Sequence, residues 1–178
     1  YLTQSWQLYA EAAMPALERL YTIAPSFRAE KSRTRRHLTE FWHAEMEIAW
    51  ATNDEVMNHG EGVVRHIAST LLDERSEELQ SLGRDLELIG RYADSPFPRM
   101  RYDEAIEILQ GKGVDVEWGQ DLDYSKEKIL TQDFDVPHFL THYPKIAKPF
   151  YHRVDPEDDK YVLCHDLLAP EGYGEIIG

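Results

Sequence analysis

The sequence predicts an α+β fold in which an antiparallel β-sheet is flanked by helices. Its 178 residues, of which 42% are hydrophobic, are enough for one domain with a substantial core. Segments with a two-residue apolar alternation are interrupted by segments of helical period, an order typical of antiparallel strands with inserted helices. The sequence contains neither an internal repeat nor a low-complexity tract, so we expect a globular rather than a disordered chain.

The first third of the chain is expected to form one helix and a hairpin of two strands. Ser5 would cap a helix that runs to about Leu20, in which Pro15 permits a kink or a break. Two strands are predicted over 21–30 and 38–50, joined by a polar loop. Such a pair is typical of an antiparallel hairpin with one buried face and one functional face.

Alternation along the strands assigns side chains to these two faces. The buried face of the second strand would carry Trp42, Ala44, Met46, Ile48 and Trp50. The functional face would carry Arg28, Glu30, Phe41, His43, Glu45 and Glu47.

The remaining elements follow from helix caps and from periodicity. A long helical region is predicted from Asn53 or Asp54 to about Tyr92, with breaks near Gly60 and Gly83. After a proline-containing linker, two short helices are predicted over 103–110 and 124–131. Four strands are predicted over 138–142, 149–153, 160–168 and 174–178.

Composition narrows the class of protein. The net charge of −14 gives an acidic surface that repels nucleic acid and anionic membranes at long range, although residues 28–36 form a local basic patch. No run of about 18 apolar residues is present, so we expect no membrane-spanning segment. Cys164, the single cysteine, excludes an intrachain disulfide and favours a reducing, cytoplasmic location. Its apolar neighbours indicate a core position rather than a nucleophile.

The hairpin combines charges with aromatic residues in a pattern that suits a nucleotide. The guanidinium of Arg28 can bind a phosphate in a fork geometry, and Phe41 on the same face can stack on a base. The loop supplies cations for the far end of a triphosphate, which are Arg33, Arg35, Arg36 and His37. The alternative is a solvent-exposed hairpin with Arg–Glu pairs, each worth only about 0–1 kcal/mol.

A second candidate site lies near the end of the sequence. Asp166 and Glu175 are placed on consecutive predicted strands across a turn rich in proline and glycine. Two carboxylates brought together beside a phosphate site commonly hold Mg²⁺. The alternative is that they are two unrelated surface acids.

These motifs resemble a known family. The runs Ser26–Glu30 and Arg36–Phe41 resemble motif 2 of the class II aminoacyl-tRNA synthetases, in the aspartate, asparagine and lysine subgroup. Further segments match that subgroup in the same order, at 3–7, 97–106, 118–122, 141–145 and 174–178. The resemblance covers essentially all of residues 1–178 and implies the central part of a catalytic domain.

Within that part, motif 2 would span about 21–50, a helical insertion about 53–94, and the metal-binding strands about 160–178. Motif 1 would precede Tyr1 and motif 3 would follow Gly178. We therefore expect a homodimer formed through segments outside these residues, and a fragment that is poorly active alone.

The resemblance implies ATP-dependent formation of an aminoacyl-adenylate, followed by transfer of the amino acid to tRNA. Arg28 would hold the α-phosphate and stabilise the transition state, while Arg36 and His37 would contact the β- and γ-phosphates. Phe41 would stack on adenine and the backbone of Leu38 would read its edge. Glu30 would lie near adenine or the tRNA end. The Mg²⁺ ligands would be Asp166 and Glu175.

The resemblance also bears on the amino acid. Ser5, Gln7 and Glu45 would bind its α-amino end. Aspartate enzymes of the subgroup carry a lysine where this chain has Ala10, and without that cation a buried substrate carboxylate would lose its pairing. This favours L-asparagine, and therefore tRNA(Asn). Two further residues could select the side chain of the substrate, Glu11 and His43. The alternative for Glu11 is an acid on the helix surface without this role.

Three alternatives remain open from the sequence. The first is a paralogue that does not use tRNA, such as an ammonia-dependent asparagine synthetase. The second is an aspartate enzyme of relaxed specificity. The third is a catalytically inactive interaction domain, against which the complete set of motif 2 residues argues.

Overall fold

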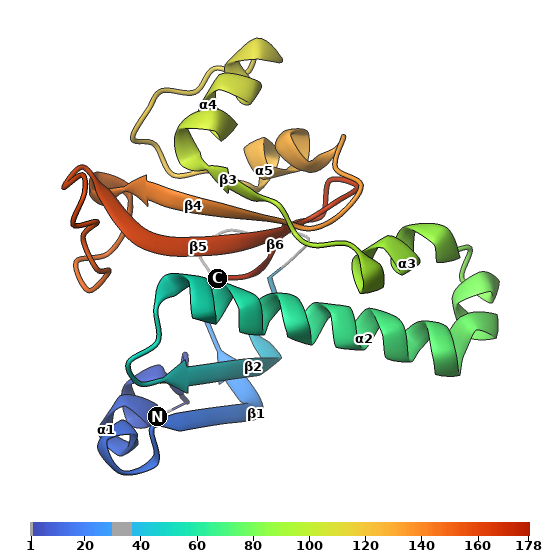
Figure 1. Cartoon of the computed structure of the whole chain (residues 1–178), viewed down its shortest axis with the longest axis horizontal. Coiled ribbons are helices and arrows are strands. Elements are labelled where there is room, and N and C mark those ends of the chain that lie inside the picture. Colours follow the sequence, from blue (N-terminus) through green and yellow to red (C-terminus); the bar gives the residue numbers. More distant parts are fainter. Residues whose placement is uncertain (1, 30–36) are drawn as a thin grey trace. The chain divides into compact units, whose positions relative to one another are not determined.

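A computed structural model describes residues 2–29 and 37–178 (Figure 1). Glu30, Arg33, Arg35 and Arg36, which were predicted to contact ATP, lie outside these described residues. The chain divides into two compact units, Tyr1–Thr52 and Asn53–Gly178. Each unit is described by itself below.

The first unit contains a helix and a two-stranded antiparallel sheet, the hairpin. Helix α1 spans Gln7–Leu17, strand β1 spans Arg19–Phe27 and strand β2 spans Glu40–Ile48. The predicted antiparallel pairing is confirmed. The helix continues past Pro15 but ends before the predicted Leu20, because Glu18 takes a positive φ of 56° that reverses the chain.

The two predicted faces of the hairpin are confirmed by the strand register, since residues directly opposite each other share a face. Ser26 lies opposite Phe41, whereas Pro25 lies opposite Trp42. The prediction that the apolar face is buried is wrong for this unit. Trp42 is 74% exposed and Tyr21 is 80% exposed, whereas Ser26 on the polar face is buried.

The polar face is the more buried one because the segment before α1 lies on it. It packs on the polar face through Ser5 and Trp6, which contact Glu45. Among the described residues of this unit, none covers Tyr21 or Trp42 to a comparable degree.

The second unit begins with the predicted helical region, which is divided into the helices α2, kinked at Arg75, and α3. Helix α2 spans Asn53–Ser81 and helix α3 spans Leu86–Asp94, and Asp85 caps α3 by accepting from two backbone N–H groups. The predicted break at Gly83 is confirmed, with a φ of 70°. The predicted break near Gly60 is wrong.

Gly60 instead marks a close approach between α2 and the sheet. A methyl group at this position would lie 3.9 Å from the side chains of Phe139 and Ile177. The helix therefore runs through Gly60, where its backbone lies against two strands at a distance that would also accommodate a methyl group.

A four-stranded sheet forms the centre of the second unit, in the order β3-β4-β5-β6. Its strands span Arg99–Arg101, His138–Pro144, Tyr161–Ala169 and Gly174–Ile177. The last three are antiparallel as predicted, but the short β3 was not predicted and pairs with β4 in parallel.

The strand predicted over 149–153 is wrong. These residues form a turn in which the His152 N–H donates to the Pro149 carbonyl, and β-pairing begins only at Val154, which bridges Val162. The Pro149 carbonyl is therefore paired within the turn rather than with a neighbouring strand.

Helices cover both faces of this sheet (Figure 1). The predicted helices near 103–110 and 124–131 are confirmed as α4, Tyr102–Gly111, and α5, Tyr124–Thr131. Apolar residues of α4 and α5 pack on one face with Leu140 and Leu168. On the other face, Met57 of α2 packs with Phe139 and Leu167.

No helix in residues 2–29 or 37–178 combines the length and the apolar character needed to cross a membrane.

Candidate functional site

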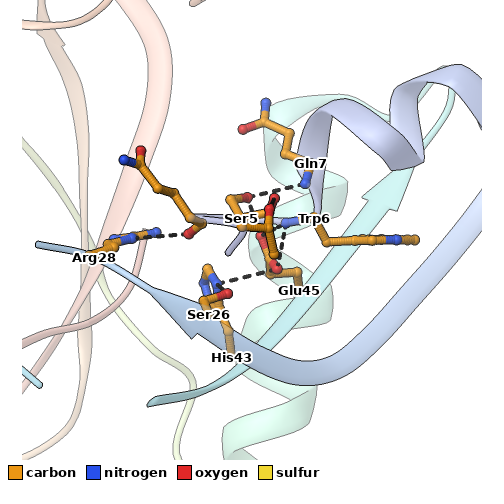
Figure 2. Close-up of polar contacts among 9 residues, drawn as sticks. Ser5, Trp6, Gln7, Ser26, Arg28, His43 and Glu45 are labelled. Atoms are coloured by element: carbon orange, nitrogen blue, oxygen red, sulfur yellow. Dashed lines mark hydrogen bonds and ion pairs between the residues drawn. The ribbon is translucent and has the colours of Figure 1, made fainter. Parts of the chain in front are cut away.

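Glu45 anchors the segment before α1 onto the polar face of the hairpin (Figure 2). Its carboxylate accepts the Ser5 hydroxyl and the Trp6 N–H, the latter at 3.2 and 3.1 Å from its two oxygens. The Gln7 N–H in turn donates to the Ser5 hydroxyl oxygen at 3.1 Å. These N–H groups are at the start of the helix, where no backbone partner is available. The N-cap residue is Trp6, one residue after the predicted Ser5, and Glu45 and Ser5 supply acceptors for the N–H groups at this end of α1.

His43 links this anchor to the neighbouring strand. Its Nδ1 lies 3.1 Å from the hydroxyl oxygen of Ser26 and 3.2 Å from Oε2 of Glu45. Burial lowers the pKa of His43; Arg28 adds to this shift and Glu45 opposes it. The folded protein thus favours neutral His43 at neutral pH. As the pH falls below 6.5, the unfolded chain takes up a proton at His43 before the folded protein does. The free energy of unfolding therefore decreases over that range.

This electrostatic arrangement predicts how two substitutions should shift the pKa of His43. Arg28→Ala should raise the pKa of His43 because it removes a nearby cation, and Glu45→Gln should lower it because it removes a nearby carboxylate. NMR titration of the His43 ring nitrogens measures both shifts. Arg19→Ala, on the opposite face of β1, is the matched control and should leave the titration unchanged. Shifts of the opposite sign would contradict this arrangement.

Arg28 and Phe41 lie together on the polar face, as the alternation predicted. The Arg28 guanidinium carbon is 5.3 Å from the centroid of the Phe41 ring, within the range of a cation–π contact. Its Nε donates to the Gln4 carbonyl at 3.2 Å, while its backbone N–H donates to the Thr39 carbonyl at 2.9 Å. The side chain is exposed. An oriented, accessible guanidinium beside an aromatic ring suits a ligand with both a phosphate and a base.

The other predicted amino-acid-binding residues lie on α1. The Gln7 side-chain amide donates to Glu11 at 3.2 Å, one helical turn away, and Glu11 is exposed. Ala10 is almost completely buried, so this position offers a substrate no charged side chain. His37 and Leu38, predicted to contact ATP, are exposed.

The carboxylates of Glu11, Glu45 and Glu47 are close enough in the first unit to influence one another. Burial raises the pKa of Glu47, and the charges of Glu11 and Glu45 raise it further. The resulting negative potential suits a cationic group such as an ammonium.

In the second unit, Asp166 and Glu175 converge as predicted. The β5–β6 register shifts between Leu167 and Leu168, which leaves Ile176 as an extra residue and brings Glu175 opposite Leu168. A methyl group built on Gly178 would lie 2.6 Å from Oε1 of Glu175 and 3.1 Å from Oδ1 of Asp166. One oxygen of each carboxylate therefore borders a single point. We call Asp166 and Glu175 the carboxylate pair.

The donor set of this pair limits the ions that it suits. Within the described ranges, no cluster of three or more His, Cys, Asp or Glu side chains is arranged to hold a metal. Two carboxylates without imidazole or thiolate partners match Mg²⁺, which takes one or two protein carboxylates and completes its shell with water and phosphate oxygens. They do not match a structural zinc site.

Lys148, which no sequence pattern indicated, contacts Asp166 of the carboxylate pair from a turn. Its Nζ is 3.1 Å from Oδ2 of Asp166 and 3.9 Å from the centroid of the Tyr143 ring. Burial opposes its charged form, but Asp166 and Asp121 outweigh burial and raise the pKa of Lys148. Burial, reinforced by Asp166, also raises the pKa of Tyr143.

Cys164 on β5 packs against the core, as predicted, and burial raises the pKa of its thiol to about 11. It is therefore protonated at neutral pH, which disfavours a role as nucleophile.

Comparison with known proteins gives consistent matches over the whole chain. Residues 1–178 match the family described as tRNA synthetases class II (D, K and N). Two curated relatives are asparagine–tRNA ligases, from Pyrococcus horikoshii (53% identical over 178 residues) and Thermococcus gammatolerans (52%). Each alignment covers 100% of this chain but 41% of the relative, so the chain spans about two fifths of their length.

Solved structures agree with these matches. The asparaginyl-tRNA synthetase of P. horikoshii complexed with asparaginyl-adenylate superposes with a TM-score of 0.94 at 52% identity, over 99% of this chain and 40% of that one. The enzyme of Entamoeba histolytica, also with asparaginyl-adenylate, gives 0.88 at 32% identity, with the same coverage. An aspartyl tRNA synthetase of E. histolytica gives 0.82 at 29%, over 99% of this chain and 37% of that one.

Proposed function

From the premise that the chain belongs to the class II tRNA synthetases of the aspartate, lysine and asparagine group, we propose that it is the central part of an asparagine–tRNA ligase. The proposed reaction joins asparagine to ATP, giving asparaginyl-adenylate and pyrophosphate, and then transfers the asparaginyl group to tRNA(Asn). The observation that carries this proposal is the TM-score of 0.94, at 52% identity, to a synthetase complexed with asparaginyl-adenylate.

Arg28 is the proposed catalytic residue of the first step. An oxygen of the asparagine carboxylate attacks the α-phosphorus of ATP, and the bond to pyrophosphate breaks. Negative charge accumulates on the α-phosphate oxygens, where a fixed guanidinium stabilises the transition state more than the ground state. The Gln4 carbonyl and the Phe41 ring orient that guanidinium in the absence of substrate, which supports this role. Phe41 is then the proposed platform for adenine.

Recognition of asparagine is proposed to involve Ser5, Gln7 and Glu45. The Glu45 carboxylate provides the negative charge that attracts the substrate ammonium, while its bonds to Ser5 and Trp6 hold it in place. Buried Ala10 leaves no cation to pair with a substrate side-chain carboxylate. Neutral His43 likewise adds no positive charge. A neutral side-chain amide therefore suits this surface better than aspartate does.

The proposal is tested by ATP–pyrophosphate exchange with the full-length protein that contains this chain. We expect exchange to depend on L-asparagine, with aspartate giving at least about tenfold less activity, since an unpaired buried charge costs several kcal/mol. Charging of tRNA(Asn) transcripts tests the second step. Exchange that depends on aspartate alone would refute the proposed substrate, and no exchange with either amino acid would refute the activity.

The carboxylate pair is proposed to hold Mg²⁺, which when bound offsets the charge of the triphosphate. We expect Glu175→Gln to raise the Mg²⁺ concentration for half-maximal exchange by about tenfold or more. The matched control is Glu157→Gln, which makes the same change in an exposed turn and should have no effect. An unchanged Mg²⁺ requirement in Glu175→Gln would show that the ion binds elsewhere.

We further propose that the full-length protein is a cytoplasmic homodimer. The family supports the dimer, and the presence of only one cysteine in residues 1–178 is consistent with a reducing compartment. Sedimentation equilibrium tests the dimer.

A further inference from the structure

Lys148 is a cation held in a fixed position beside the carboxylate pair. Its ammonium group lies between Oδ2 of Asp166, at 3.1 Å, and the face of the Tyr143 ring, at 3.9 Å from the centroid. Only 17% of the Lys148 side chain is exposed, and Tyr143 is almost completely buried. The exposed Asp121 lies farther away, at 4.0 Å. Because water has little access, the Lys148–Asp166 interaction is screened less than a surface ion pair.

The two oxygens of Asp166 consequently have different surroundings. Oδ2 accepts from Lys148, whereas Oδ1 borders the same point as Oε1 of Glu175, above the α-carbon of Gly178. A carboxylate held from one side in this way presents one oxygen in a defined direction. Oδ2 already accepts from Lys148, so Oδ1 is the oxygen of Asp166 that is more available to an ion.

Lys148 also changes the local charge. The carboxylate pair alone carries two negative charges, and the ammonium offsets one of them. A divalent cation is therefore attracted less strongly than by an isolated pair of carboxylates. A polyphosphate that arrives with the ion brings additional negative charge and oxygen ligands, which restores a favourable balance.

We propose that Lys148 is a positioning residue that directs one oxygen of Asp166 toward the ion and weakens binding of a divalent cation by the protein alone. Under this proposal the ion binds together with the nucleotide rather than before it. The inference rests on the proposed metal site at the carboxylate pair.

The test measures binding of Mn²⁺, used as a paramagnetic probe, to the full-length protein without nucleotide, by the EPR signal of the free ion. We expect Lys148→Gln, which keeps a hydrogen-bond donor but loses the charge, to bind Mn²⁺ about tenfold more tightly than the unsubstituted protein. Lys145→Gln is the matched control, since it removes the same charge from an exposed side chain three residues away, and should leave the affinity unchanged.

A second neutral variant, Lys148→Met, guards against misfolding, because its apolar chain can retain the contact with the Tyr143 ring. In addition, exchange by Lys148→Gln should reach half-maximal rate at a lower Mg²⁺ concentration. A change in packing alone would not produce tighter metal binding. Unchanged or weaker Mn²⁺ affinity in the folded neutral variants would overturn the proposal.

The Glu175→Gln variant separates this inference from the proposed metal site. If Glu175→Gln leaves Mn²⁺ binding in the presence of ATP unchanged, the metal site itself is wrong. If Glu175→Gln weakens that binding while the Lys148 variants show no gain, only the role of Lys148 is wrong.

Discussion

Replacing Arg28 by alanine is expected to lower the maximal rate of ATP–pyrophosphate exchange by roughly 10²-fold or more in the full-length protein. The guanidinium is exposed on the polar face of the hairpin and oriented by Gln4 and Phe41. Its loss removes a charge directed at the α-phosphate, where negative charge develops during the reaction. Steady-state exchange at saturating ATP and asparagine measures the effect.

Two further variants make this prediction specific. Arg28→Lys keeps the charge but loses the fork of donors, so it should recover only part of the rate. Arg19→Ala removes an arginine from strand β1, which ends just before Arg28, on the opposite face of the hairpin, and should have little effect on exchange. A loss of less than about threefold in Arg28→Ala would show that this side chain does not contact the reacting phosphate.

Replacing Glu45 by alanine is expected to produce two losses. The Ser5 hydroxyl and the Trp6 N–H lose their shared acceptor, which should lower the free energy of unfolding by about 2–3 kcal/mol. The substrate ammonium loses its proposed counter-charge, which should lower exchange by about 10²-fold when asparagine is limiting. Urea denaturation and exchange kinetics measure these effects independently.

A conservative variant separates the two roles of Glu45. Glu45→Gln keeps an acceptor oxygen for Trp6, so it should be more stable than Glu45→Ala while exchange stays low. Glu40→Gln, on the apolar face of the same strand, is the matched control for both measurements. Full exchange activity in a folded Glu45→Gln variant would leave Glu45 with its capping role only.

Much of the candidate site could be predicted because it depends on short-range regularity. Side chains alternate along a strand, so Phe41, His43 and Glu45 were assigned to one face before their neighbours were known. Helix α5 was predicted with its observed bounds, and the structure shows that Asp123 caps it, accepting from the N–H groups of Ser125 and Lys126. Asp166 and Glu175 were predicted to meet because a short turn joins antiparallel strands.

Other features depend on packing between segments that are distant in sequence, and the periodicity of apolar residues does not encode such packing. Strand β3 has three residues, too few to show an alternation, and it pairs with β4 across more than thirty intervening residues. Gly60 signals a helix break in a sequence, yet α2 continues through it and packs there beside Phe139 of the sheet. Lys148 is eighteen residues from Asp166, and only the folded turn brings them together.

The sequence by itself determined which residues share a face and which residue types the candidate site contains, because alternation and side-chain chemistry are local properties. Only the tertiary structure decided which face is covered. The segment containing Ser5 and Trp6 packs against polar Glu45, while Trp42 stays exposed within its unit. Only the tertiary structure also placed the Lys148 ammonium on one oxygen of Asp166. Burial and charge pairing arise from contacts across the fold, and one residue's neighbours in sequence do not specify them.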